Sequence, residues 1–176
     1  MSQDPRSRQF VRVARRLIYL AVLLGVMIFF IRYDVVTIPD DYIHLTPQHM
    51  SPGTRVVLAD CNEDTVLGVG SVVVFDPPGF PGQSCWGAVA GLPGETLTVD
   101  IQSDGMANVV IGGRKELLLV TDDWQLSSGV IPDGQFVLLA GDRHLRVPST
   151  FPDSRRLGPI VRDQIVSKVV TPLSFF

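Results

Sequence analysis

The chain has 176 residues, of which 45% are hydrophobic, and a formal net charge of −3 at neutral pH. This length accommodates one domain with a small additional element. The mildly acidic balance, with no basic run interleaved with aromatic residues, argues against a nucleic-acid ligand.

An apolar run near the N-terminus is the first predicted element. Leu17 to Ile31 covers 15 residues without a charge or a proline. A bilayer span needs about 20 residues, and apolar residues up to Val36 extend the predicted transmembrane segment to residues 17–36. A cleaved signal peptide is the alternative, but its cleavage site needs small residues, whereas Phe29 to Asp34 is bulky and charged. We therefore expect a retained signal anchor.

The charges on the two sides of this segment predict its orientation. Residues 1–16 contain five arginines and one aspartate, a net charge of +4. From Arg32 onward, 10 basic residues face 17 acidic ones, a net charge of −7. Positively charged flanks stay on the cytoplasmic side of a membrane. Residues 1–16 are thus predicted to be a cytoplasmic N-terminus, and residues 37–176 an extracytoplasmic (periplasmic) domain anchored to the inner cell membrane by one span.

Beyond the anchor the sequence predicts a mainly β fold. Eight short segments rich in β-branched and apolar residues read as strands: 55–58, 71–75, 87–90, 96–101, 107–111, 116–120, 135–140 and 165–170. Clusters of Gly, Pro and Asp separate them, and no later segment shows helical periodicity over 11 residues. Short strands joined by regular turns favour an antiparallel, partly barrel-like domain.

The Gly-Leu-Pro-Gly sequence at 91–94 stands between two of these predicted strands. Proline presets one turn angle and glycine accepts the positive φ beside it, so a tight turn is expected here. The apolar residues on both sides predict a hairpin in the core of the domain.

Two cysteines and three histidines limit the redox and metal chemistry of the chain. Cys61 and Cys85 both fall at predicted strand ends, and an outer compartment permits disulfides. The sequence does not supply the Cα separation that a bridge requires, so their pairing stays open. The histidines are scattered and match no metal-ligand spacing. We expect no metal and no cofactor.

Four segments in chain order resemble the signal peptidase I family (peptidase S26), including its relatives that process conjugation pilins. Residues 47–53 follow the anchor and are similar to the family's nucleophile segment, and residues 69–75 to its Gly-Asp-hydrophobic strand. Residues 87–95 are similar to its lysine-bearing strand and Gly-Leu-Pro-Gly-Asp turn. Gly141-Asp142-Arg143 with Pro152 to Ile160 resembles its Gly-Asp-Asn-Arg and Asp-Ser-Arg segments. The resemblance implies a signal-peptidase-like β domain.

This chain differs from the signal peptidase I family at the positions of the catalytic residues. The family uses a serine hydroxyl that is activated by a neutral lysine amine in a dry pocket. By residue-to-residue matching, His49 occupies the nucleophile position and Gly87 the position of the lysine base. Pro47 stands where a serine assists the oxyanion. The sequence therefore predicts a pseudoenzyme, because losing nucleophile and base together removes about a millionfold of rate.

Other residues of the matched segments receive binding or structural roles. Ser51 is a possible displaced nucleophile, although a turn role before Pro52 is favoured. A groove for a peptide or partner is expected at Met50, Pro52, Val89 and Leu92, where an extended segment could add as a strand. For Asp142, Asp153, Ser154 and Arg155 a hydrogen-bonded structural turn is favoured over an active-site cluster.

The resulting hypothesis is a non-catalytic, membrane-anchored protein that serves as a structural or accessory subunit of a larger membrane complex. Its expected partners are integral membrane proteins and lipid, with no nucleic acid and no small-molecule substrate. Two alternatives remain: an active membrane-bound serine endopeptidase with displaced catalytic residues, and a module that binds peptides without cutting them. The sequence does not indicate the partner or the oligomeric state.

Overall fold

The structure, a computed structural model, describes residues 5–38, 50, 53–140 and 152–173. The chain divides into two compact units, Met1–Asp34 and Val35–Phe176. The first contains helix α1 (Pro5–Arg32), and the second contains nearly all of the β-structure.

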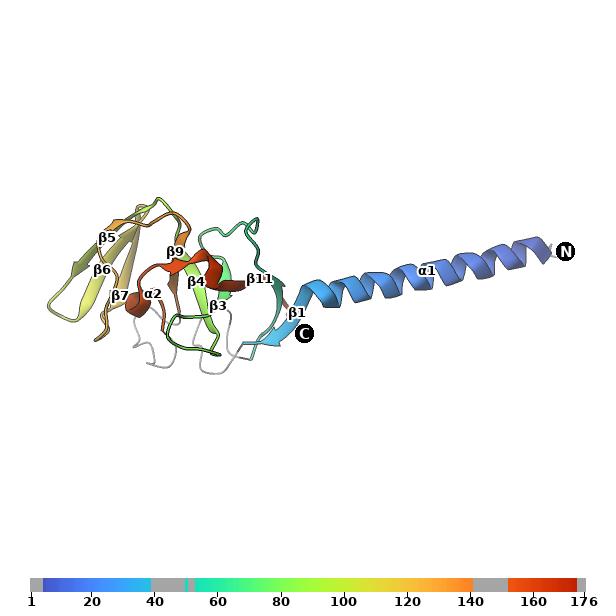
Figure 1. The fold of residues 1–176 in the computed structure, drawn as a ribbon, viewed down its shortest axis with the longest axis horizontal. Helices are drawn as coiled ribbons and strands as arrows, with labels where there is room; N and C mark the ends of the chain where they lie inside the picture. The colour runs from blue at the N-terminus through green and yellow to red at the C-terminus, as the bar shows by residue number, and fades with distance from the viewer. Residues whose placement is uncertain (1–4, 39–49, 51–52, 141–151, 174–176) are drawn as a thin grey trace. The chain divides into compact units, whose positions relative to one another are not determined.

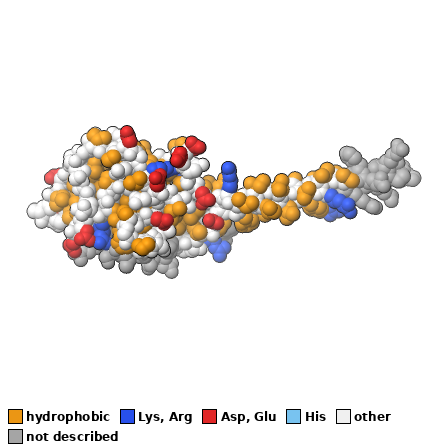
Figure 2. Space-filling view, in the orientation of Figure 1, with side chains coloured by type: hydrophobic (Ala, Val, Ile, Leu, Met, Phe, Trp, Pro, Cys, Tyr) orange, Lys and Arg blue, Asp and Glu red, His pale blue; other side chains and the backbone are white. Residues whose placement is uncertain are grey.

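Helix α1 contains the predicted apolar run. Its Val13–Arg32 portion has 20 residues and a mean hydropathy of 2.1, so by length and composition it can cross a membrane. At 1.5 Å rise per residue it matches a hydrocarbon layer of about 30 Å. Figure 2 shows hydrophobic side chains along this portion of the helix, and nearly all of them are exposed. One N-terminal apolar helix is therefore available as a membrane anchor.

The helix ends earlier than the sequence predicted. Residues 17–36 were expected to form one transmembrane segment, but α1 stops at Arg32 and Tyr33–Thr37 is strand β1. The β-branched residues Val35, Val36 and Thr37 favour an extended backbone. Strand β1 also has a neighbour in a sheet, β2, which pairs with the backbone groups on one of its sides.

The described strands form two antiparallel sheets (Figure 1). The seven-stranded sheet has the order β1-β2-β11-β3-β4-β9-β10, and the four-stranded sheet has the order β7-β6-β5-β8. The strands after β1 are β2 (Arg55–Asp60), β3 (Val72–Phe75), β4 (Cys85–Gly91), β5 (Thr96–Ile101), β6 (Met106–Ile111), β7 (Arg114–Leu119), β8 (Gly129–Val130), β9 (Gln135–Leu139), β10 (Ile160–Val161) and β11 (Ile165–Leu173). The mainly β fold class with one N-terminal apolar helix is thus confirmed.

Four short elements of the described structure were not predicted from the sequence. Strands β8 and β10 have two residues each, helix α2 (Ser154–Leu157) has four and the 3-10 helix η1 (Arg162–Gln164) has three. Elements this short show no hydrophobic periodicity of their own. The two strands form because distant strands supply their hydrogen bonds, β5 for β8 and β9 for β10, whereas α2 and η1 are held by bonds within a few residues.

The predicted hairpin around the Gly-Leu-Pro-Gly turn is wrong. Strand β4 pairs with β3 and β9, whereas β5 pairs with β6 and β8. The turn itself forms: the N–H of Glu95 donates to the carbonyl of Leu92, and Gly94 has a φ of 79°. The turn carries the chain from one sheet to the other, and the Glu95 carboxylate also binds Arg114, which ties the turn to β7.

The two cysteines are free thiols. Cys85 on β4 is opposite Phe75 on β3, and Phe75 is opposite Ile165 on β11. The N–H of Cys61 donates to the carbonyl of Val166 on the far side of β11. Two strands therefore separate the cysteines, and neighbouring strands are about 4.8 Å apart. A disulfide requires Cα atoms closer than about 7 Å, so this sheet order keeps the thiols apart.

Candidate functional site

Strand β4 carries the position that the sequence matches to a lysine base. Every residue of β4 is buried, and β3 and β9 flank the strand on its two sides. Gly87 lies opposite Val73 of β3. The position is therefore in the centre of the seven-stranded sheet and not at an exposed edge.

The space in front of Gly87 is filled by apolar side chains. A Cβ atom added to Gly87 would lie 3.3 Å from Cβ of Leu138 and 3.3 Å from Cε1 of Phe75. These separations are shorter than ordinary van der Waals contact between carbon atoms, which is about 3.5–4.0 Å. Phe75 and Leu138 are themselves fully buried. A longer side chain at this position would displace the packed core.

Met50 and Val89 lie on opposite faces of the seven-stranded sheet. Met50 packs in a cluster with Trp86 and Ala88 of β4, whereas Val89 packs in a different cluster with Phe75. Successive side chains of a strand point to opposite faces, which explains the separation. Met50 and Val89 are only 2% and 1% exposed. The structure therefore does not bring them together in one open groove.

The remaining predicted groove and nucleophile positions are placed only in part. Leu92 is partly buried and packs against the cluster that holds Val89. His49, Ser51 and Pro52 lie outside the described residues, as does Pro47.

Both lysines of the chain lie away from the face that holds Met50. Val169 belongs to the Met50 cluster, so its neighbour Lys168 projects to the opposite face of β11. There the Nζ atom of Lys168 donates a hydrogen bond to the carbonyl of Val66 at 2.9 Å. Lys115 is on β7, in the other sheet. Neither amine faces the Met50 cluster.

Asp153, Ser154 and Arg155 form a buried corner at the end of β9. All three residues have 0% exposure. Asp153 accepts a hydrogen bond from the N–H of Ala140 at 2.9 Å, and Ser154 Oγ accepts one from the N–H of Leu138 at 2.8 Å. Asp142, the fourth residue predicted for this turn, lies outside the described residues.

Arg155 supplies the opposite charge in this corner. Its Nη2 atom is 3.0 Å from Asp153 Oδ2 and donates to the carbonyl of Ala140 at 3.0 Å. Asp153 also caps helix α2 by accepting the N–H of Arg155. A buried charge is tolerated when it is paired and hydrogen-bonded, and this arrangement meets that condition. The corner thereby holds α2 against the end of β9.

Two observations on the described residues concern metal binding and thiol chemistry. No group of three His, Cys, Asp or Glu side chains there could hold a metal ion. Burial raises the pKa of the Cys61 thiol, with Arg162 and Lys168 opposing the shift, and Cys85 has 0% exposure. Buried thiols with raised pKa are poor nucleophiles at neutral pH.

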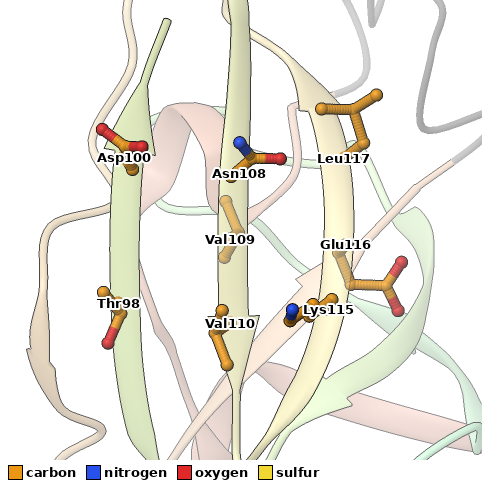
Figure 3. Close-up of a pocket in the computed structure, with 8 residues that line it drawn as sticks. All are labelled: Thr98, Asp100, Asn108, Val109, Val110, Lys115, Glu116 and Leu117. Carbon is orange, nitrogen blue, oxygen red and sulfur yellow. The ribbon is translucent and has the colours of Figure 1, made fainter.

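A second surface is an open depression of about 480 Å³ on the outer face of the four-stranded sheet. Figure 3 shows Thr98 and Asp100 on β5, Asn108 on β6, and Lys115 and Leu117 on β7 side by side. No role was predicted for these residues from the sequence. The sequence signal that could have identified this face is the alternation along the strands of exposed polar residues with buried apolar ones such as Val109 and Leu118.

Comparison of this chain with known proteins finds similarity among solved structures. The chain matches no protein-family model and no curated protein. It is similar to the crystal structure of a signal peptidase I from Enterococcus faecalis, with 21% sequence identity and a TM-score of 0.40. The alignment covers 61% of this chain and 98% of that chain.

Proposed function

We propose that this chain is a non-catalytic, signal-peptidase-like membrane protein that serves as a structural or accessory subunit of a larger membrane complex. The observation that carries the proposal is the closed space in front of Gly87. Leu138 and Phe75 lie 3.3 Å from where its Cβ would be, so a lysine there would require these buried side chains to move. The position lies within the buried core of the sheet, which supports the absence of a catalytic base there.

The placement of the two lysines supports the same proposal. A serine–lysine dyad needs an uncharged amine within hydrogen-bond reach of the hydroxyl, about 2.6–3.2 Å. Lys168 projects away from the Met50 cluster and donates to the carbonyl of Val66, and Lys115 lies on the other sheet. Neither lysine stands at position 87, where the resembled family has its base, and the Lys168 amine is engaged by the carbonyl of Val66.

The anchor supplies the membrane part of the proposal. Val13–Arg32 is long and apolar enough to cross a bilayer, and the arginines of residues 1–16 favour a cytoplasmic N-terminus. The β domain is then extracytoplasmic. Its expected partners are integral membrane proteins, with lipid around the helix.

A cleavage assay tests the catalytic half of the proposal. The full chain in detergent micelles is incubated with a preprotein that carries an uncleaved signal sequence, beside an active signal peptidase I as the positive control. We expect no processed product. Processing that disappears in Ser51→Ala, while a matched Ser71→Ala variant retains it, would establish the active endopeptidase instead.

Co-purification tests the structural half. The full chain is extracted from native membranes in mild detergent after brief cross-linking, and its partners are identified by mass spectrometry. Stoichiometric co-migration with integral membrane proteins is expected. A monomer that binds synthetic signal peptides and carries no membrane partner would instead support the peptide-binding alternative.

A further inference from the structure

Strand β7 is the outer strand of the four-stranded sheet, and β6 is its only neighbour in the described sheet order. An outer strand presents a row of backbone N–H and C=O groups that have no partner in the sheet. This edge belongs to a different sheet from Gly87, so binding to it does not require that the peptidase chemistry be absent.

The β6–β7 loop determines which backbone groups of β7 face outward. Gly112 and Gly113 form a two-residue loop with φ values of 53° and 83°, as a type I′ hairpin requires. In such a hairpin the flanking pair, here Ile111 and Arg114, is hydrogen-bonded across the strands. The even-numbered residues of β7 therefore bond to β6. The N–H and C=O groups of Lys115, Leu117 and Leu119 point away from it.

Two hydrogen bonds at the ends of the hairpin agree with this assignment of even-numbered and odd-numbered residues. The N–H of Gly112 donates to the carbonyl of Thr96 on β5, so even-numbered residues at that end of β6 face β5. The N–H of Val120 donates to the carbonyl of Gly105, so the even-numbered residue after β7 still faces the β6 side. Among the described residues, none pairs with the outward groups of Lys115, Leu117 and Leu119.

The side chains of Lys115 and Leu117 lie on the open face of the sheet. Both line the depression in Figure 3, and Leu117 is 40% exposed. Within the described part of the chain, Lys115 has neither an ion pair nor a side-chain hydrogen bond. A strand added beside β7 would thus meet, on this face, a cation and then an apolar side chain two residues on.

We propose that β7 binds an extended peptide segment of a partner protein by antiparallel strand addition, with an acidic side chain opposite Lys115 and an apolar one opposite Leu117. The backbone groups at 115, 117 and 119 supply the hydrogen bonds. The charge of Lys115 and the exposed surface of Leu117 supply the selection. This division between main-chain affinity and side-chain selectivity is general for strand addition at sheet edges.

A second copy of this chain fits the edge less well. Antiparallel pairing of two β7 strands centred on Leu117 places Lys115 of each copy opposite Leu119 of the other. Each ammonium group then faces an aliphatic side chain and gains no carboxylate partner. Lysine on an outer strand is also a known device that discourages pairing between copies.

Amide hydrogen exchange on the full chain in detergent micelles tests the geometry first. The amides of Glu116 and Leu118 should exchange slowly, and those of Lys115, Leu117 and Leu119 rapidly. Slow exchange at all five positions would mean that the edge is already covered, and it would overturn the proposal.

Peptide binding tests the occupant. The probe is a fluorescein-labelled peptide, Thr-Val-Thr-Val-Thr-Glu-Thr, whose Val, Val and Glu residues stand opposite Leu119, Leu117 and Lys115. Its matched control carries Lys in place of Glu. Two further peptides carry N-methyl groups. In one they are on the Val and Glu amides, which face β7, and in the other they are on the Thr amides, which face away from it. Saturable binding by fluorescence anisotropy is expected for the Glu peptide and for its Thr-methylated form, with loss for the other methylated form.

Variants of β7 identify the site of binding. Leu117→Pro removes one outward N–H without removing a bond to β6, since proline is accepted on an outer strand where its missing N–H faces solvent. It should abolish binding, whereas the matched Leu117→Ala variant retains the N–H and should weaken it only. Lys115→Glu should weaken binding of the Glu peptide about fivefold and strengthen that of the Lys peptide, as cross-strand charge pairs do.

Besides slow exchange along the whole edge, three binding results would overturn the proposal. They are no saturable binding of any probe, binding that Leu117→Pro leaves unchanged in a variant that keeps its thermal unfolding midpoint, and self-association of the full chain that Leu117→Pro removes. The last would show that the occupant of the edge is a second copy.

Discussion

Asp153 and Arg155 form an ion pair with 0% exposure at the end of β9, and both side chains are hydrogen-bonded to the backbone of Ala140. Asp153 accepts the N–H of Ala140, and Arg155 donates to its carbonyl. Both backbone groups of Ala140 are therefore bound by side chains of one corner. Ala140 directly follows the last residue of β9, so these side chains take the place of a neighbouring strand for its backbone groups.

Substitution of Asp153 should be strongly destabilising. Asp153→Asn removes the carboxylate that pairs with the buried Arg155 guanidinium, and breaking a buried ion pair costs about 3–5 kcal/mol of unfolding free energy. The matched control is Asp123→Asn, which removes an ion pair with Arg156 whose aspartate is 61% exposed. Exposed pairs contribute about 0–1 kcal/mol. Equal losses for the two variants in denaturant unfolding would contradict a stabilising role for the buried pair.

Substitution of Gly87 measures how closed the position matched to the lysine base is. Gly87→Ala forces a methyl group to within 3.3 Å of Leu138 and Phe75, and overpacking of this kind costs about 1–3 kcal/mol. Gly87→Lys should cost more, because an amine would also be buried. Gly129→Ala is the control, since nothing lies within 4 Å of its added Cβ. Thermal unfolding midpoints report the difference; a Gly87→Lys variant as stable as the parent would show that the packing there can open.

The Glu95–Arg114 pair predicts a dependence of stability on pH. The hydrogen bond from Arg114 lowers the pKa of Glu95 below its ordinary value of 4.5. A carboxyl whose folded pKa is depressed contributes stability above its unfolded pKa, and this is lost as the pH falls through the folded value. The pair should therefore stabilise the turn fully at about pH 7, and its contribution should fade as the pH falls from about 4.5 through the lower folded pKa of Glu95. Its side chains are partly exposed, so the effect is modest.

Glu95→Gln isolates this contribution. The variant keeps a similar shape and removes the charge, so it should unfold more easily than the parent at about pH 7. The two should converge once the pH falls below the folded pKa of Glu95, which lies below 4.5. Urea unfolding across this range checks the convergence. A stability difference that stays constant with pH would show that the titration of Glu95 is not its source.

The cysteines should remain reduced in an oxidising compartment. Two strands separate Cys61 from Cys85 in the sheet order. Alkylation of the denatured chain without reductant should label both thiols, as read by intact mass. In the folded chain both should react slowly at neutral pH, because Cys85 is fully buried and burial raises the pKa of Cys61. A mass two hydrogens lower, with no labelling, would demonstrate a disulfide and a different strand arrangement.

Local patterns located most of the strands. β5 was predicted at its observed bounds of 96–101, and the observed β3, β6 and β9 differ from the predictions by one residue at one end. These strands carry alternating or β-branched apolar residues between Gly, Pro or Asp turns, which is a signal contained in the chain itself. The boundary of α1 and the short strands β8 and β10 were missed, because their ends depend on which strand lies alongside.

The site was less accessible to prediction. The motif match identified Gly87, but it could not show that Phe75 and Leu138 fill the space in front of it, since these residues are on two other strands. Met50 and Val89 were assigned to one groove because both belong to matched segments. The structure separates them because residues 86 and 88 of β4 point to one face and residue 89 to the other.

The sequence alone determined the apolar helix, the mainly β composition and the Gly-Leu-Pro-Gly turn, because helix length, β-branched alternation and backbone φ preferences are properties of neighbouring residues. Only the tertiary structure decided which strands are partners, that β4 and β5 belong to different sheets, and that β7 is an outer strand. These features depend on hydrogen bonds and packing between residues far apart in the chain, and no local pattern encodes which distant segment supplies them.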